Sequence, residues 1–413
     1  MRVYITSNSP GELAGWVRPV AKKLKEKRED VETVLIIPPC QYASGKEVGV
    51  ARSFFGIKYV LGPRDYIRYI LSGRSFPFTR KAGEKEGVCV FLGGDPFHTV
   101  LVSRKLRLPA VAYLQRPRWR RQFERFMVMD ERIKKENFLQ QKVEPEKVVV
   151  VGDLTVDAVE VQLEDEKVFD DECRLEGPVI SIMPGSRPQI ACNMILFFLR
   201  ACEVIKQEFA RAQFFLIFSP FLKEKELFNL DRAKINKIFP VPGVEPIRKG
   251  DKLHLLTSGG LEAEVVVEGR YRILSLSDLV LTIPGTNTAE LAYLGVPMLV
   301  TVPLTRPELI PLDGLAGVAG DFPFLGALIK RWVVKKYNES IRFCSIPNIR
   351  AGREIVPEVR GKIRPEDVAD EAIKLLKDKK RLSSISLELK KVGGVPGAAS
   401  RVADVILEVA GGN

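Results

Sequence analysis

The residues with the clearest chemical potential lie in the segment 281–300, LTIPGTNTAELAYLGVPMLV. An apolar run predicts a strand that ends at Pro284. The helix expected next begins with Gly285, Thr286, Asn287 and Thr288. The first N–H groups of a helix lack intrahelical partners and the helix dipole favours negative charge there, so this start suits a diphosphate. Glu290, about one turn later, can accept hydrogen bonds from ribose hydroxyls. A buried helix with a polar cap is the other interpretation, and the spacing favours nucleotide binding.

A second polar loop, MPGSRPQI at Met183–Ile190, follows another apolar run. Gly185 and Ser186 expose backbone amides, and the guanidinium of Arg187 is a planar, bidentate donor. This combination suits phosphate oxygens. The phosphate-loop pattern G-x-x-x-x-G-K-[ST] does not occur in the chain. On local grounds a plain strand-to-helix turn with a solvated Arg187 is an equal alternative.

The loop Ser7–Gly15, SNSPGELAG, follows the first expected strand. Gly11 and Gly15 allow a tight turn and the close approach of a ligand to the backbone, and Glu12 lies in the first turn of the next helix. One interpretation is a loop that contacts an acceptor sugar. The other is an ordinary helix start with a favourable N-terminal carboxylate.

The loop Leu92–His98, LGGDPFH, follows the third expected strand, and its two glycines place Asp95 on a bare turn. A partly desolvated carboxylate in a cleft can act as a general base toward a hydroxyl, and His98 could do the same work. The alternative makes Asp95 the N-cap of a helix that begins near Thr99. The local sequence favours the cap.

Short β-branched runs alternate with longer amphipathic stretches along the chain, beginning with a strand at Arg2–Thr6. This alternation predicts an α/β protein with mostly parallel sheets covered by helices on both faces. An acidic, aperiodic stretch around Leu163–Glu176 indicates a linker between two such halves. We expect an N-terminal domain at 1–165, a second domain at 175–390 and a C-terminal helix within 391–413. Ligands of doubly wound sheets bind beyond the carboxyl ends of the strands, where the four loops lie.

The composition favours a globular protein with anionic partners. Of the 413 residues, 46% are hydrophobic and 28% charged, which excludes a disordered or collagen-like chain. The charge balance is 64 − 52 = +12, which favours nucleic acid, acidic lipid or phosphorylated substrates as partners. The chain has no apolar run of the about 18 residues that span a membrane. The N-terminal MRVYITS lacks the pattern of a signal peptide. A cytoplasmic location is therefore expected.

Metal ligands are scarce in this sequence. The six cysteines are scattered without a C-x-x-C pair, and only two histidines occur, which argues against a zinc site. The chain also lacks an Asp-x-Asp pair, which commonly bridges a divalent cation and the diphosphate of a sugar nucleotide. A sugar transferase with this sequence would be metal-independent, and Arg187, helix dipoles and backbone amides would compensate the charge.

Taken in order, these loops and two later segments resemble the lipid-A-disaccharide synthases, which are glycosyltransferases of the GT-B fold. The most specific match is Ile346–Glu358, IPNIRAGREIVPE, which is similar to the family's L-P-N-x-x-A-G-R-E-V-V-P-E. The other matches, with the family's pattern in brackets, are Gly11–Gly15 (G-E-x-S-G-D), Asp95 (D-A-P-D-F), Pro184–Arg187 (P-G-S-R), Gly285–Glu290 with Leu294–Pro297 (G-T-x-T-x-E…L-G-V-P) and Gly394–Ser400 (G-x-x-G-A-S).

The resemblance implies two Rossmann-like, doubly wound domains that face a central cleft, with the last helix packed back on the N-terminal domain. It also implies the inverting transfer of a diacylated glucosamine from UDP to a lipid-like glucosamine 1-phosphate, without a cofactor or metal. Asp95 would be the base or a group that aligns the acceptor hydroxyl, and the local sequence leaves His98 as the second candidate base. Gly11, Glu12 and Gly15 would contact the acceptor. The donor would be held by Gly185, Ser186, Arg187, Gly285, Thr286, Asn287, Thr288, Glu290, Asn348, Arg353 and Glu354.

Several segments have a composition that is typical of membrane interfaces. Phe322–Lys336 places apolar residues beside Lys, Arg and Trp, and Phe54-Phe55 and Arg116–Arg121 around Trp119 add to it. A core helix with a solvated basic edge is the alternative. RNA binding by Arg116–Arg121 is disfavoured because no RNA-binding fold is evident. The expected partners are a UDP-sugar donor, a lipid-linked or phosphorylated acceptor and an anionic membrane surface, but no nucleic acid. A homodimer is left open.

The departures from the family pattern concentrate on the acceptor side. Trp16 stands where the family has the Asp of S-G-D, Gly93 and Gly94 rewrite the D-A-P-D-F loop, and Pro311–Arg331 resembles an insertion. The donor half is closer to the pattern, which supports a UDP-sugar transferase more than any particular acceptor. Two other functions stay open: a UDP-sugar epimerase of the same architecture, and a non-catalytic protein that binds a nucleotide sugar or lipid.

Overall fold

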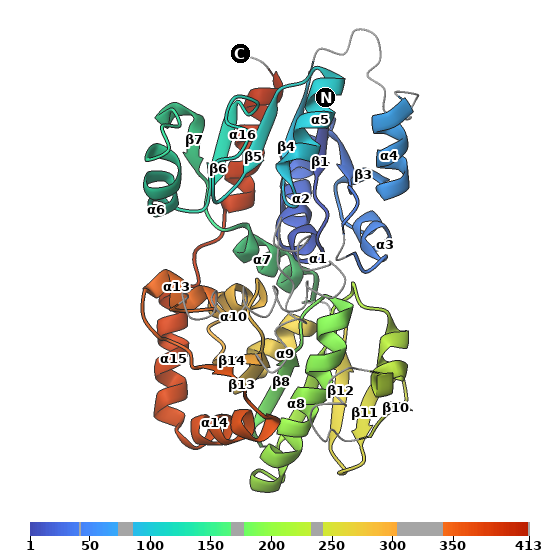
Figure 1. Cartoon of the computed structure of the whole chain (residues 1–413), viewed down its shortest axis with the longest axis vertical. Coiled ribbons are helices and arrows are strands. Elements are labelled where there is room, and N and C mark those ends of the chain that lie inside the picture. The colour runs from blue at the N-terminus through green and yellow to red at the C-terminus, as the bar shows by residue number, and fades with distance from the viewer. Residues whose placement is uncertain (41–42, 73–85, 167–176, 233–242, 304–341, 412–413) are drawn as a thin grey trace, which may run out of the picture. The chain divides into compact units, whose positions relative to one another are not determined.

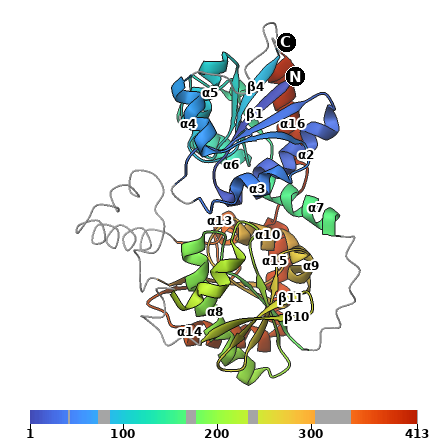
Figure 2. The same ribbon diagram turned by 90° about the vertical axis from the view of Figure 1, so that its right-hand side faces the viewer.

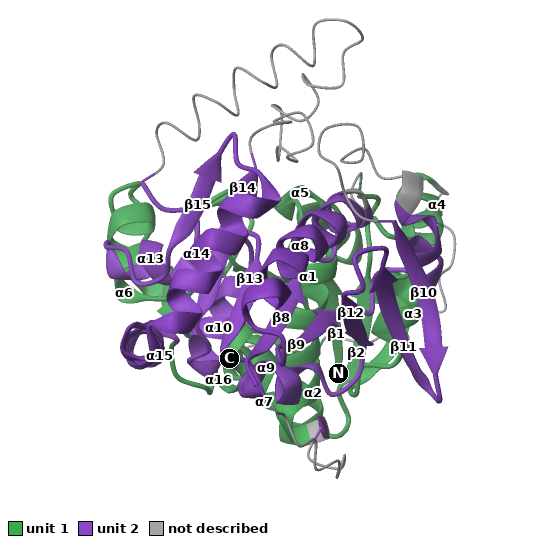
Figure 3. Ribbon diagram, turned by 90° about the horizontal axis from the view of Figure 1, so that it is seen from below, with its two compact units in different colours: residues 1–164, 394–413 green, residues 165–393 purple. Residues whose placement is uncertain are grey.

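The chain forms two compact units, which are described here one at a time. The computed structural model describes residues 1–40, 43–72, 86–166, 177–232, 243–303 and 342–411. The first unit comprises residues 1–164 and 394–413, and the second comprises residues 165–393 (Figure 3). Each unit contains a mostly parallel sheet with helices on both faces, so the predicted α/β architecture with two domains is confirmed. The expected insertion at Pro311–Arg331 and the interfacial stretch Phe322–Lys336 lie outside the described residues.

The sheet of the first unit has the strand order β3-β2-β1-β4-β5-β6-β7, and its strands pair in parallel (Figure 1). Both faces of a parallel sheet are covered, which explains why its central strands are continuous apolar runs. In β4 every residue is buried. The strands are β1 (Arg2–Thr6), β2 (Glu32–Ile36), β3 (Ile57–Leu61), β4 (Gly87–Phe91), β5 (Ala110–Tyr113), β6 (Arg125–Val128) and β7 (Val148–Val150).

Helices cover both faces of this sheet, with α2 and α16 on one side and α4 and α5 on the other (Figure 2). Phe54 is buried and Phe55 is exposed, so only the second of this expected interfacial pair faces solvent. The helices are α1 (Pro10–Glu12), η1 (Leu13–Val17), α2 (Arg18–Lys27), α3 (Glu47–Arg52), α4 (Pro63–Ser72), α5 (Pro96–Leu106), α6 (Glu131–Ile133), η2 (Lys134–Leu139), η3 (Pro145–Lys147), α7 (Leu154–Glu166) and α16 (Ala398–Gly411).

The start of α16 is fixed to the first unit by the carboxylate of Asp157 on α7. Its Oδ1 accepts the N–H groups of Gly397 (3.0 Å) and Ala399 (3.1 Å), and its Oδ2 accepts that of Ala398 (3.0 Å). These are N–H groups that have no partner within a helix, and a carboxylate also interacts favourably with the dipole there. Asp157 is buried. The residue therefore acts as an N-cap supplied from a distant point of the sequence.

Replacing Asp157 with Ala is expected to lower the free energy of unfolding of the first unit by about 2 kcal/mol, because three buried donors lose their acceptor. Amide hydrogen exchange in residues 398–411 should accelerate before exchange in β1 and β4 does. Asp404→Ala is the matched control, since Asp404 lies on the exposed side of the same helix, in an ion pair with Lys27. Equal exchange in α16 of the two variants would contradict the capping role.

The sheet of the second unit has the order β10-β11-β12-β9-β8-β13-β14-β15. Five pairs are parallel, and β10 and β11 form an antiparallel hairpin that pairs antiparallel with β12. The sequence analysis missed this hairpin. The strands are β8 (Val179–Met183), β9 (Gln213–Ile217), β10 (Val244–Lys249), β11 (Lys252–Thr257), β12 (Glu262–Val266), β13 (Leu279–Thr282), β14 (Met298–Pro303) and β15 (Glu358–Gly361).

Helices also cover both faces of the second sheet, with α8 packed on α14 and α10 packed on α15. None of the described helices, in either unit, is long and apolar enough to cross a membrane. The helices of this unit are α8 (Pro188–Glu208), η4 (Glu224–Arg232), α9 (Arg270–Leu276), α10 (Asn287–Leu294), α13 (Ile346–Ala351), α14 (Pro365–Lys377) and α15 (Lys379–Val392).

The linker begins later than the sequence predicted. It was expected from Leu163, but α7 stays helical through Glu166, and residues 167–176 lie outside the described part of the chain. The carboxylate of Glu166 accepts the N–H groups of Tyr271 (3.1 Å) and Arg272 (3.1 Å) at the start of α9. The acidic residues that suggested a linker are good helix formers, and one of them serves as a cap.

Candidate functional site

The candidate donor site lies at the point of the second sheet where the strand order reverses. The first strand, β8, pairs with β9 on one side and with β13 on the other, so the loops after β8 and β13 diverge from neighbouring strand ends. Ligands of doubly wound sheets bind at this position. The two loops are Met183–Arg187 and Ile283–Thr286, and they contain the P-G-S-R and P-G-T segments that the sequence singled out.

The two loops are in direct contact. The hydroxyl of Thr282 donates to the carbonyl of Met183 at 3.2 Å, across the paired strand ends. Gly185 has a φ of +93°, and a Cβ at this position would lie 2.9 Å from the Ile283 side chain. Gly185 is therefore required both for its backbone conformation and for the approach of the second loop. The predicted residues of these loops come together in one place.

The side chains at the start of α10 shape the loop rather than reach outward. Asn287 Nδ2 donates back to the Thr282 hydroxyl and to the Ile283 carbonyl (3.1 Å). The buried hydroxyl of Thr288 donates to the Gly285 carbonyl at 2.8 Å and accepts the N–H of Ile346 at 3.1 Å. Backbone N–H groups in the first turn of α10 already donate to the carbonyls of Gly285 and Thr286. What this segment offers an anion is therefore the positive end of the helix dipole.

Glu290 is held by a residue that the sequence analysis did not single out. The hydroxyl of Tyr271 on α9 donates to Glu290 Oε2 at 2.9 Å, and the Arg270 guanidinium donates to the same hydroxyl at 3.0 Å. Tyr271 is 1% exposed, and burial raises its pKa, so the phenol is protonated at neutral pH and donates its hydrogen bond. The pair fixes the direction of the Glu290 carboxylate. No local motif marks Tyr271, because its role arises from packing between α9 and α10.

On the sequence-based expectation that Glu290 binds the ribose of UDP, Tyr271→Phe should weaken UDP binding about fivefold, because the carboxylate loses the donor that orients it. Glu290→Ala should weaken binding by about tenfold or more, since it removes the acceptor itself. Isothermal titration of UDP into each variant measures both. A larger effect for Tyr271→Phe than for Glu290→Ala would show that the tyrosine acts in some other way.

The P-N…P-E segment is organised around Asn348, which the structure places inside the unit. Its side chain is 0% exposed. Oδ1 accepts the N–H groups of Ile355 (2.7 Å) and Val356 (3.0 Å), and Nδ2 donates to the Val356 carbonyl (2.8 Å) and to Glu358 (2.9 Å). The expected direct contact of Asn348 with the donor is therefore replaced by a positioning role, because its polar atoms already serve the loop.

Glu358, at the end of the same motif, was also not singled out. Its carboxylate is 3% exposed and accepts the N–H groups of Cys344 and Ser345, the Ser345 hydroxyl (2.7 Å) and the amide of Asn348. A buried carboxylate is tolerated when several donors surround it. Asn348 and Glu358 together fix the start of α13, whose Ile346 N–H reaches the Thr288 hydroxyl of the α10 segment.

The remaining predicted donor residues lie on the surface of the second unit. Arg353 is exposed and forms an ion pair with Glu388 on α15, and Glu354 is exposed beside it. Gly285 is also exposed, and its φ of +152° favours glycine. Ser186 and Arg187 are half-buried between β8 and α8. These positions stay predictions for donor contacts.

In the sheet of the first unit the strand order reverses between β1 and β4, as it does at β8 in the second sheet. These strands pair in parallel, and the loops Ser7–Ser9 and Leu92–Asp95 follow them. Gly93 and Gly94 have φ values of +123° and +85°. A Cβ at Gly93 would overlap the Glu12 carboxylate, and one at Gly94 would lie 2.5 Å from Asn8 Oδ1. The glycines that depart from the family pattern thus make room for the polar side chains of the first loop, and Glu12 and Asp95 belong to one cluster of loops.

Asp95 caps a helix and also forms an ion pair. Its Oδ1 accepts the N–H of Phe97 at 2.9 Å, which makes it the N-cap of α5. Its Oδ2 lies 3.1 Å from Arg118, and its side chain is 46% exposed. The helix begins at Pro96, three residues before the expected Thr99. The cap interpretation from the local sequence is therefore correct. The catalytic role of Asp95 stays a prediction, and its second oxygen faces the half-exposed guanidinium of Arg118.

His98, one turn into α5, is paired with Tyr66 of α4. Its Nδ1 lies 2.7 Å from the tyrosine hydroxyl. Burial lowers the pKa of His98, and the neighbouring carboxylate of Asp95 partly opposes this shift. Burial also raises the pKa of Tyr66 to about 12. The neutral phenol and the neutral imidazole share one hydrogen bond, and the ring tautomer decides which of the two donates.

The low pKa of His98 has a consequence for stability. Because the pKa of His98 is lower in the folded chain, the unfolded chain binds the proton more readily, and protonation favours unfolding. The free energy of unfolding is therefore unaffected by this group above the pKa of an unfolded histidine. It decreases as the pH falls from there through the lower pKa of the folded chain. An NMR titration of the C2 protons measures the folded pKa directly. The chain has only two histidines, so His254→Asn assigns the resonance. Tyr66→Phe should change the pKa of His98, because the hydrogen bond to its Nδ1 is lost.

Gly11 and Gly15 lie in the turn between β1 and α2. Gly15 is buried within η1, a short π-helix at Leu13–Val17 that precedes α2. Such π-turns are often found at functional sites. Trp16, which replaces the family's aspartate, packs edge-on against Tyr113 with ring centroids 5.1 Å apart. The position therefore contributes packing rather than charge. The acceptor contacts of Gly11, Glu12 and Gly15 stay predictions.

Comparison with known sequences confirms the resemblance to lipid-A-disaccharide synthases. The chain is 25% identical to the enzyme of Solibacter usitatus over 97% of its own length and 96% of that protein. It is 29% identical to the enzyme of Anaeromyxobacter dehalogenans and 25% identical to that of Syntrophus aciditrophicus. These two matches cover 56% and 57% of the chain but about half the length of each relative. No protein-family model matches the chain. The chain is thus a distant relative of these enzymes.

Solved structures confirm the fold. The chain aligns with a putative UDP-N-acetylglucosamine 2-epimerase from Listeria monocytogenes with a TM-score of 0.57, at 15% identity over 97% of the chain and 94% of that structure. S. aureus MnaA, solved with UDP, gives 0.56 at 14% identity over 98% and 95%. Acinetobacter baumannii MurG gives 0.50 at 13% identity over 98% of each chain. The two units together have the architecture of GT-B glycosyltransferases and epimerases.

Proposed function

We propose that this chain is an inverting glycosyltransferase that moves an acylated glucosamine-type sugar from UDP to a lipid-linked or phosphorylated sugar. One observation carries the proposal. The carboxylate of Glu290, which Tyr271 orients, lies in the first turn of α10, where the strand order of the second sheet reverses. A fixed carboxylate suits the hydroxyls of a ribose, and the positive end of a helix dipole suits a diphosphate. The family name of the distant relatives supplies the substrate class.

In the proposed donor site, Glu290 accepts hydrogen bonds from the uridine ribose. The positive end of the α10 dipole and the loop at Gly185 and Ser186 receive the diphosphate. Arg187, at the N-cap of α8, supplies positive charge as the leaving UDP develops its negative charge. With this charge compensation the transfer needs no metal and no further cofactor.

In the proposed acceptor site, Asp95 removes the proton from the attacking hydroxyl. An inverting transfer needs one base on the side of the sugar opposite the leaving group. The carboxylate stands on a rigid turn, because Pro96 and the N-cap hydrogen bond fix its backbone. Glu12 lies in the neighbouring loop and is proposed to hold a hydroxyl of the acceptor. An acceptor with acyl chains would bring the protein to an anionic membrane surface on the cytoplasmic side.

A UDP-sugar epimerase is the second candidate, because solved structures with this fold include UDP-N-acetylglucosamine 2-epimerases. The two functions differ in whether an acceptor is consumed. An epimerase converts the donor without one, whereas a transferase releases UDP only when a second sugar is present.

The experiment is to incubate the purified protein with UDP-2,3-diacylglucosamine, with and without acylated glucosamine 1-phosphate, and to measure UDP release. We expect release only with the acceptor, together with a new β-linked disaccharide. An isomerised sugar nucleotide in the absence of acceptor would instead support the epimerase. UDP binding without any turnover would leave only a binding protein.

A further inference from the structure

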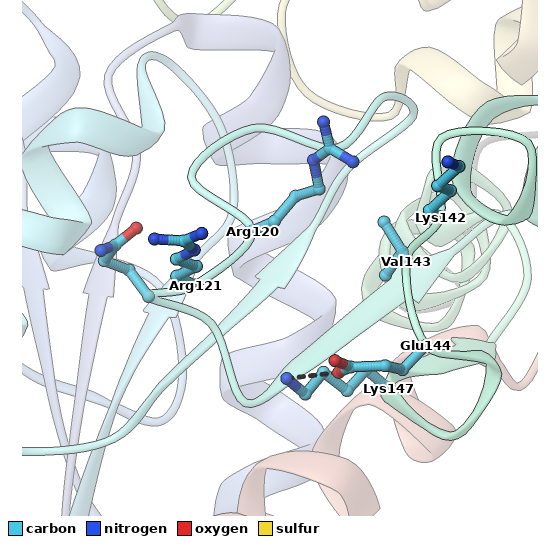
Figure 4. A pocket seen from close by; sticks show the side chains of 7 residues that line it. Arg120, Arg121, Lys142, Val143, Glu144 and Lys147 are labelled. Carbon is cyan, nitrogen blue, oxygen red and sulfur yellow. Dashed lines mark ion pairs between the residues drawn. The ribbon is translucent and has the colours of Figure 1, made fainter.

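A basic pocket lies on the first unit and is lined by residues other than those of the candidate acceptor site, although Arg118 of one of its loops pairs with Asp95. Its volume is about 570 Å³, within the range of small-molecule sites. Two loops form it, one leading into β6 and the other into β7 (Figure 4). Both loops therefore reach the amino ends of parallel strands, whereas the loops after β1 and β4 leave the carboxyl ends. The lining residues are Arg120, Arg121, Gln122, Lys142, Val143, Glu144 and Lys147.

The charge of this pocket is strongly unbalanced. Four of its lining side chains are cationic and one is acidic. The acidic residue, Glu144, is already paired with Lys147 at 2.5 Å, and this pair raises the pKa of the lysine. Within the described part of the chain, Arg121 and Lys142 have no acidic partner. Like charges gathered in a concave surface repel one another unless an anion is bound, so the arrangement favours an anionic ligand.

The two loops are held in place before any ligand binds. The guanidinium of Arg120 donates to the carbonyl of Gln141, which ties the first loop to the second. Val143 is buried and forms an apolar floor between the basic side chains. Figure 4 shows Arg120 and Arg121 on one loop and Lys142 with the Glu144–Lys147 pair on the other. An arginine fork beside lysines on a fixed frame suits the oxygens of a phosphate group.

Lys142 occupies a backbone position that normally belongs to glycine. Its φ is +59°, in the left-handed region, and it follows the last turn of η2. The N–H of Val143 donates to the Phe138 carbonyl at 3.1 Å, as in the common helix ending that places glycine at this residue. A lysine here costs about 1 kcal/mol relative to glycine. Conformational strain of this kind is commonly retained where the side chain has a function.

We propose that this pocket binds a phosphate group, carried either by a soluble phosphorylated molecule or by the headgroup of an anionic lipid. The proposal does not depend on the proposed transferase activity, because none of its residues belongs to the donor or acceptor sites. It gives the first unit an anion site at the amino ends of β6 and β7.

The test uses the double variant R121Q/K142G, in which the two cations without an acidic partner are removed. Glycine is favoured at φ +59°, so K142G should keep or raise the thermal stability and cannot lose binding by unfolding. The control K135Q/K380Q removes the same number of charges from exposed positions on η2 and α15, outside the pocket. Any binding of the probe at the donor site is common to all three proteins.

Two probes distinguish the sources of the phosphate. Inorganic pyrophosphate is titrated calorimetrically, and vesicles of phosphatidylglycerol are sedimented with the protein beside vesicles of phosphatidylcholine. We expect R121Q/K142G to bind at least one of the anionic probes about tenfold more weakly, and the control to stay within about twofold of the unaltered protein. Loss of pyrophosphate binding assigns a soluble ligand, and loss of vesicle binding assigns a headgroup. Equal binding by the double variant and the control, with both probes, would overturn the proposal.

Discussion

Replacing Asp95 with Asn is expected to reduce turnover by about a hundredfold or more while UDP binding stays unchanged. Asparagine is as good an N-cap as aspartate, so the hydrogen bond from Phe97 and the start of α5 are retained. What is lost is the basicity of the second oxygen. UDP release at saturating donor and acceptor measures the rate, and titration of UDP measures the donor site separately.

Arg118→Gln is the matched control for Asp95→Asn. It removes the exposed ion pair and leaves the carboxylate, so turnover should change by no more than about fivefold. His98→Gln distinguishes the second candidate base. If His98→Gln abolishes turnover and Asp95→Asn does not, the base is the histidine and the aspartate serves only as a helix cap.

The second large effect concerns the folding of the second unit. Asn348→Ala should lower its free energy of unfolding by about 3 kcal/mol or more, because the substitution leaves several buried donors and acceptors without partners. Amide hydrogen exchange of the peptide 345–358 should then accelerate strongly, since the N–H groups of Ile355 and Val356 lose their acceptor. UDP binding is expected to weaken as a consequence of the disordered segment.

Asn348→Asp separates the shape of this side chain from its donor function. Aspartate keeps an acceptor for Ile355 and Val356 but cannot donate to the Val356 carbonyl, and it places a second carboxylate against Glu358. We expect a destabilisation comparable to that of Asn348→Ala, and one that is smaller at low pH, where the carboxylates are protonated. A stable Asn348→Asp protein would argue that the network around Glu358 is unimportant.

Much of the fold followed from the sequence because its signals are local. Apolar runs such as Val88–Leu92, which lies between two glycines, and Leu279–Thr282, which a proline follows two residues later, alternate with amphipathic segments. This pattern is sufficient for a doubly wound α/β prediction. The β10–β11 hairpin was missed, because its residues are half-exposed and charged at Val244–Lys249 and lack the apolar character of a central strand. Its turn at Gly250-Asp251 was the available signal.

The candidate site was predictable where a loop follows a strand, and less so where a role depends on packing. The loops at Gly185 and Gly285 could be assigned to one place because parallel strands end at the same edge of the sheet. Tyr271, Tyr66 and Glu358 could not be found in this way, since each meets its partner through the arrangement of elements. For Asn348 the motif predicted a contact with the ligand, whereas the structure shows that its side-chain atoms form hydrogen bonds within its own segment.

The first unit cannot complete its fold until the second unit has been synthesised, because α16 belongs to the first unit but follows the second unit in the chain. Val402, Ala403 and Ile406 are buried against a unit whose other elements precede the second unit in the chain. At about 5–20 residues per second, a ribosome needs some tens of seconds to synthesise the intervening segment. During that interval the nascent first unit exposes the apolar surface that α16 later covers, and Asp157 lacks its three donors. Chaperone binding to this surface, and a slow final folding step once α16 has been synthesised, are the expected consequences.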